Sequence, residues 1–85
     1  MNLIPFSAND EIVTVSRNVE SNCNGITFIN LGTSACTVLG VPLQQGQSLT
    51  IPCNIGEVDR TNYMVRFDQT DSDTRLNVIR KNYTI

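Results

Sequence analysis

The sequence predicts a small all-β domain: an antiparallel β-sandwich or barrel of about seven strands with an extended N-terminal arm. Its 85 residues suffice for one domain with one modest hydrophobic core. Thr, Asn, Val and Ile are abundant whereas Ala, Glu and Lys are scarce, which favours strands over helices. Turn signals recur every ~8–12 residues, and no segment keeps apolar residues at the helical spacing.

Residues 1–10 are predicted to form the extended arm, because Pro5 prevents a helix there. The arm carries three apolar anchors, Leu3, Ile4 and Phe6. It either packs on its own domain or reaches for a neighbouring molecule, and the sequence leaves both open. Residues 11–85 then form the single β domain.

Alternating apolar residues and turn signals place the strands in the remainder of the chain. The clearest is 62–68, in which Tyr63, Val65 and Phe67 alternate with polar residues and are expected in the core. The expected strands are 11–16, 25–31, 35–39, 41–43, 47–53, 62–68 and 74–81. The second and third are expected to pair as a hairpin, and Gly32 and Gly46 are expected at turn positions with positive φ.

Charge, hydropathy and cysteine content argue against a nucleic-acid-binding, membrane-spanning, secreted or zinc-binding protein. The formal net charge is −2 and the basic residues are spread along the chain, which does not fit a nucleic-acid-binding surface. No apolar run approaches the ~18 residues that span a membrane, and the N-terminus does not resemble a secretory signal. Three cysteines without a short CxxC spacing argue against a zinc site. We interpret them as buried or half-buried thiols in a reducing cytoplasm, with one disulfide plus a free thiol as the alternative.

No motif for catalysis is recognisable. The chain has no histidine, which excludes Ser-His-Asp and Cys-His systems. Carboxylate pairs remain, Glu57 with Asp59 and Asp68 with Asp71 or Asp73, but all are predicted in solvated polar loops. The Asp68–Asp73 spacing also lacks the glycine and distal glutamate of a calcium loop. We therefore expect no enzyme activity, no catalytic residue, no cofactor or metal site and no small-molecule substrate.

The few aromatic residues divide into two groups. Phe28, Tyr63 and Phe67 fit core positions. Phe6 and Tyr83 lie near the two termini, where each is free to serve an interface or to cap the domain's own core. The predicted partner interface therefore comprises Leu3, Ile4, Phe6 and Tyr83.

A family resemblance covers residues 26–67. Its residues are Asn30-Leu-Gly-Thr33 after a strand, a strand ending in Gly40, and the turn Leu43-x-x-Gly46-x-Ser48 before Ile51. This pattern resembles the auxiliary (decoration) capsid proteins of crAss-like tailed bacteriophages. The resemblance implies a non-enzymatic virion structural protein on the outer capsid surface. It implies the major capsid protein as partner, with copies of the chain itself as further partners, and synthesis in the host cytoplasm.

Two other functions use the same folds and stay open. One is a carbohydrate-binding or adhesion module of a phage fibre, although the chain has no Trp to stack on a sugar. The other is an interaction domain of another particle component, such as a tail.

Overall fold

The computed structural model describes residues 3–69 and 72–83, and these residues form eight strands and no helix. The strands are β1 (Phe6–Val13), β2 (Arg17–Glu20), β3 (Gly25–Asn30), β4 (Cys36–Val38), β5 (Val41–Leu43), β6 (Ser48–Pro52), β7 (Asn62–Phe67) and β8 (Leu76–Tyr83). One four-stranded sheet has the order β1-β8-β3-β6 and the other β2-β7-β4-β5, and every pair is antiparallel. The all-β sandwich expected from the sequence is confirmed.

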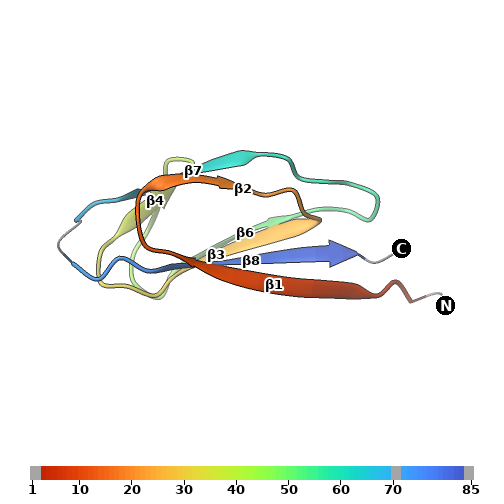
Figure 1. Ribbon diagram of the computed structural model, residues 1–85, viewed down its shortest axis with the longest axis horizontal. Coiled ribbons are helices and arrows are strands. Elements are labelled where there is room, and N and C mark those ends of the chain that lie inside the picture. The colour runs from red at the N-terminus through yellow and green to blue at the C-terminus, as the bar shows by residue number, and fades with distance from the viewer. Residues whose placement is uncertain (1–2, 70–71, 84–85) are drawn as a thin grey trace.

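The domain is elongated, with extents of 49 × 19 × 16 Å. Strands β1 and β8 run along one long side, and the start of β1 and the end of β8 lie at the same end of the molecule (Figure 1). The loop between β6 and β7 reaches toward that end as well. This arrangement gathers residues from both ends of the sequence into one region.

The core lies between the two sheets, where alternate residues of the strands point inward. Ile26, Phe28, Leu76 and Val78 fill one side. The opposite sheet contributes the expected inward set, Tyr63, Val65 and Phe67. Among residues 3–69 and 72–83, the buried apolar set is Val13, Val19, Cys23, Ile26, Phe28, Cys36, Val38, Leu43, Tyr63, Val65, Phe67, Leu76 and Val78. Burial of this surface supplies most of the driving force for folding.

The N-terminal arm differs from its predicted extent. Strand β1 begins at Phe6, so residues 6–10 pair with β8, which is the alternative in which the arm packs on its own domain. The chain leaves this sheet after Val13, and Val15, which follows the strand, is 62% exposed. Strand β2 was not expected, because its four residues include only one apolar core residue, Val19.

The expected hairpin between the second and third predicted strands is wrong. Strand β3 pairs with β6 and β8, whereas β4 pairs with β5 and β7 in the other sheet. The segment between them therefore crosses from one sheet to the other. Strands β4 and β5 do pair as consecutive neighbours, through Leu39 and Gly40 at φ 49° and 78°. Two successive positive φ values are typical of a type I′ turn.

Asn30 holds the crossing between the sheets. Its side chain is fully buried and donates to the carbonyl oxygens of Ser34 (2.9 Å) and Leu43 (3.0 Å). Its Oδ1 accepts from the Gly32 N–H at 3.0 Å. The Asn30 amide thus replaces the ladder hydrogen bonds that the backbone gives up where it changes sheets.

The two glycines singled out in the sequence serve different purposes. Gly46 has φ 84°, as expected. Gly32 does not have positive φ; a Cβ there would lie 2.2 Å from the Asp73 carbonyl oxygen. Close approach of two backbones therefore requires glycine at position 32.

We predict that Asn30→Ala lowers the free energy of unfolding by about 2–4 kcal/mol, because three buried backbone groups lose their partner. Urea unfolding followed by circular dichroism measures this. Asn18→Ala is the matched control, since Asn18 is exposed on β2 and should change stability by less than about 0.5 kcal/mol. A loss below about 1 kcal/mol for Asn30→Ala would contradict the role given to this amide.

Candidate functional site

The candidate site is built on the pairing of β1 with β8, here called the β1–β8 ribbon (residues 6–13 and 76–83). The register runs from Phe6 opposite Tyr83 to Val13 opposite Leu76. Because side chains alternate along each strand, the ribbon presents two different faces. One face looks away from the sandwich and the other looks toward β2.

The outer face of the ribbon carries an aromatic cluster, here called the terminal aromatic face (Phe6, Ile79, Lys81 and Tyr83). The rings of Phe6 and Tyr83 meet edge to face, with centroids 6.5 Å apart and planes at 78°. The Lys81 Nζ lies 5.6 Å from the Phe6 centroid and 5.0 Å from the Tyr83 centroid, a cation–π arrangement. Phe6 remains 60% exposed, so the cluster is open to a partner.

Asn24 holds the far end of β8 in place. Its Oδ1 accepts from the Tyr83 N–H at 2.8 Å, and its own N–H donates to the Lys81 carbonyl oxygen at 2.7 Å. Its Nδ2 donates to the Glu57 carbonyl oxygen at 2.6 Å. The last pair between β3 and β8 is Ile26 with Arg80, and the Asn24 hydrogen bonds lie beyond it. They hold the backbone of Lys81 and Tyr83 in place.

A mostly apolar groove of about 250 Å³ adjoins the aromatic cluster. Phe6, Ala8, Ile79 and Lys81 line it on the ribbon, and it continues over β3 to Pro52 at the end of β6. The terminal aromatic face therefore continues into a shallow apolar surface across the outer face of the sheet.

The structure brings together two of the four predicted interface residues. Phe6 and Tyr83 face each other across the ribbon, although 77 positions separate them in the sequence (83 − 6). Leu3 and Ile4 precede β1 and are 84% and 37% exposed. Neither belongs to the buried core, so both are open to solvent beside the start of the strand.

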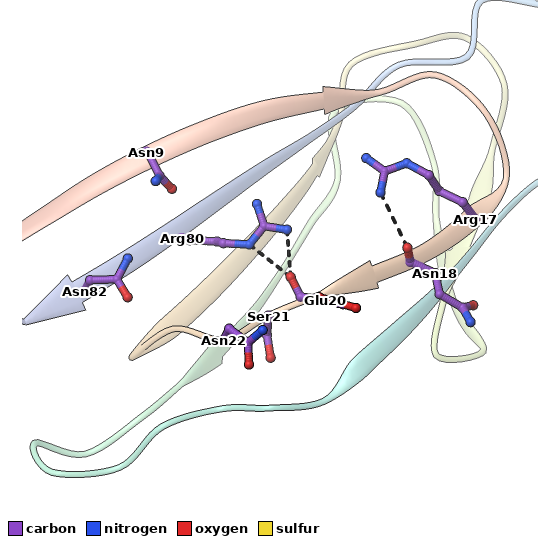
Figure 2. Close-up of a pocket in the computed structure, with 8 residues that line it drawn as sticks. All are labelled: Asn9, Arg17, Asn18, Glu20, Ser21, Asn22, Arg80 and Asn82. Atoms are coloured by element: carbon purple, nitrogen blue, oxygen red, sulfur yellow. Dashed lines mark hydrogen bonds between the residues drawn. The ribbon is translucent and has the colours of Figure 1, made fainter.

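The face of the ribbon toward β2 lines a polar hollow of about 510 Å³. It is formed where the two sheets diverge beyond the core, and eight polar residues line it (Figure 2). They are Asn9, Arg17, Asn18, Glu20, Ser21, Asn22, Arg80 and Asn82. Within the described part of the chain, the side-chain amides of Asn9 and Asn82 engage no hydrogen bond, which leaves their donors and acceptors facing the hollow.

Two arginines that line this hollow, Arg80 and Arg17, form ion pairs with Glu11, and this network is here called the Glu11 clamp. Arg80 donates to the Glu20 carbonyl oxygen from Nη2 (2.7 Å) and Nε (3.1 Å), which ties β8 to β2 (Figure 2). Its Nη2 also lies 2.8 Å from Glu11 Oε1, and Arg17 Nη2 lies 3.2 Å from Glu11 Oε2. The hydrogen bond from Arg80, with the charges of both arginines, outweighs burial and lowers the pKa of Glu11.

The carboxylates considered for catalysis have structural partners. Burial tends to raise the pKa of Asp59, but hydrogen bonds from Tyr63, Thr61 and Ser21 outweigh it and lower the pKa. Burial and the Asp59 carboxylate raise the pKa of Tyr63 to about 12. Asp59 therefore stays ionised and ties its loop to β2 and β7, unlike a general acid, which needs a raised pKa.

The other acidic candidates give no cluster. Asp73 pairs with Arg75 at 2.8 Å, and Asp71 lies outside the described residues. Over residues 3–69 and 72–83, no group of three or more His, Cys, Asp or Glu side chains is placed to hold a metal ion. The same residues contain no helix long and apolar enough to cross a membrane. Cys23, Cys36 and Cys53 are free thiols, two buried and one half-buried, as interpreted from the sequence.

No protein-family model, curated protein or solved structure matches the chain. Sequence reasoning found Phe6 and Tyr83 but missed Lys81 and the Glu11–Arg80 pair. Their pairing depends on the β1–β8 register, and the only local signal was an adjacent basic pair, Arg80-Lys81.

We predict that the Glu11 clamp makes stability pH-dependent. The folded pKa of Glu11 lies below its ordinary value of 4.5, so its contribution is present above that value and is lost as the pH falls through the folded pKa. Glu11→Gln should therefore destabilise the domain at pH 7 and have a smaller effect near pH 3. Urea unfolding of both proteins at the two pH values tests this, and an equal loss at both would contradict the clamp.

Proposed function

We propose that this chain is a non-enzymatic structural protein that binds the outer surface of a phage capsid through its terminal aromatic face. The single observation that supports a binding role most strongly is the Phe6–Lys81–Tyr83 cluster, in which Phe6 is exposed and Lys81 and Tyr83 are half-buried. Aromatic residues exposed in a preformed cluster are typical anchors of protein interfaces. The capsid as the target rests on the family resemblance of residues 26–67.

The geometry of the face suits a protein surface better than a small ligand. Phe6, Tyr83 and the adjoining groove form a mostly apolar area on the paired strands β1 and β8. Large exposed apolar patches on soluble proteins mark interaction sites. Lys81 adds a positive charge at the centre, which favours a partner with acidic residues around an apolar contact.

The division of the chain also supports the proposal. The residues that carry the resemblance, 26–67, form β3 to β7 and the turns between them. The terminal aromatic face lies on β1 and β8, outside that region. If β3 to β7 form a scaffold that related proteins share, a binding surface on β1 and β8 can differ between them and determine which particle each protein binds. Display of many copies would then let weak single contacts hold through avidity.

We predict that the double variant Phe6→Ala with Tyr83→Ala weakens binding to purified capsids by about tenfold or more, since both anchors are lost. Binding is measured as saturation of intact particles, which should reach a fixed copy number per capsid. Stability should change by about 1 kcal/mol or less, because Phe6 is exposed and Tyr83 is only half-buried.

Leu39→Asn is the matched control. Leu39 is also an exposed apolar residue, but it lies in the β4–β5 turn, and Asn-Gly suits that type I′ turn. The control should bind capsids like the unchanged protein. Absence of the protein from purified particles, or saturable binding unaffected by the double variant, would contradict the proposed function.

The polar hollow favours a second candidate, a module that binds carbohydrate. Unengaged amides such as Asn9 and Asn82 can donate to and accept from sugar hydroxyl groups, and Arg80 lies between them. The lining contains no aromatic ring, so binding would rest on hydrogen bonds alone.

We predict that, if this second function holds, a glycan array gives specific hits that are lost in Asn9→Ala with Asn82→Ala. Asn54→Ala is the control, because Asn54 lies in the loop after β6 and does not line the hollow. An array without hits, or hits unchanged by the double variant, would eliminate the hollow as a glycan site.

A further inference from the structure

The four edge strands of the sandwich are protected to different degrees. Unpaired edges invite pairing with other chains, and proteins blunt them with short length, proline or lysine. Edge strand β2 has four residues, β5 has three with Pro42 at its centre, and β6 ends in Pro52. Strand β1 has eight residues and contains neither proline nor lysine. It is therefore the longest edge, and two acidic residues, Asp10 and Glu11, are its only charges.

The sequence of β1 suits antiparallel pairing with a second copy of itself. A two-fold axis normal to the sheet keeps the outer faces of both copies on the same side, so opposite residues must share a face. With Asn9 on the axis, Phe6 lies opposite Ile12 of the second copy, and Ala8 lies opposite its Asp10. Phe6 and Ile12, which are 60% and 46% exposed, would pack side by side as a cross-strand pair on the outer face.

The neighbouring registers are less favourable. Centring the pair on Asp10 sets two Asp10 carboxylates directly opposite each other, and like charges in that position are destabilising. Centring it on Ala8 places Phe6 opposite an Asp10 carboxylate and brings Pro5, which has no N–H, into the ladder. The pairing on Asn9 avoids both problems.

We propose that this chain forms a two-fold dimer by antiparallel pairing of β1 with β1 of a second copy, centred on Asn9. The two four-stranded sheets then join into one continuous sheet. Because the axis is normal to that sheet, both terminal aromatic faces point the same way. The dimer would present two copies of the terminal aromatic face to one surface, which would add avidity to the proposed capsid binding. Formation of the dimer does not depend on capsid binding.

A charge-exchange series tests the register. The unchanged chain should sediment as a monomer–dimer equilibrium over about 1 µM to 1 mM. Ala8→Asp places an aspartate opposite Asp10 of the second copy, twice by symmetry, and should weaken dimerisation about tenfold. Adding Asp10→Lys to Ala8→Asp makes both pairs opposite in charge and should restore the dimer.

Both positions are exposed, so the variants should fold, which circular dichroism checks directly. Analytical ultracentrifugation then measures the dimer dissociation constant of the unchanged chain, of Ala8→Asp and of the double variant. A chain that stays monomeric over the whole range would overturn the proposal, as would a dimer that is unaffected by Ala8→Asp. Capsid binding is measured separately, so an unchanged chain that stays monomeric but still binds capsids would refute only this inference.

Discussion

Eight consecutive residue pairs join β1 to β8, and this pairing between the two ends of the chain determines what the surface offers. It sets Phe6 against Tyr83 on the outer face and Glu11 near Arg80 on the inner face. A shift of one residue would exchange the two faces, because side chains alternate along a strand. The aromatic cluster, the polar hollow and the free edge therefore all depend on one register.

Two sets of polar contacts fix that register. Arg80 bridges from β8 to the Glu20 carbonyl oxygen of β2 and to Glu11 of β1, so it links the sheets where the apolar core ends. Asn24 secures the backbone of residues 81 and 83 beyond the last β3 pair. The ribbon can thus extend past the core and still hold its side chains in one arrangement, which lowers the ordering cost of binding.

The sequence predicted the fold class and the core positions Tyr63, Val65 and Phe67, because alternation in residues 62–68 reports directly which side chains point inward. It did not predict which strands pair. Gly32 and its neighbours resembled a hairpin turn, but the buried amide of Asn30 carries the chain to the other sheet instead. Phe6 and Tyr83 were found as aromatics without a core position. Lys81 and the clamp were missed because their partners are distant in sequence.

We propose that the terminal aromatic face is the surface that contacts the capsid. A cryo-electron microscopy map of capsids saturated with the protein tests it most directly. We expect the outer face of the β1–β8 ribbon to lie against the capsid, with Phe6 and Tyr83 at the contact. Particles that contact the β4–β5 turn or the loop after β6, with Phe6 and Tyr83 facing solvent, would contradict the account.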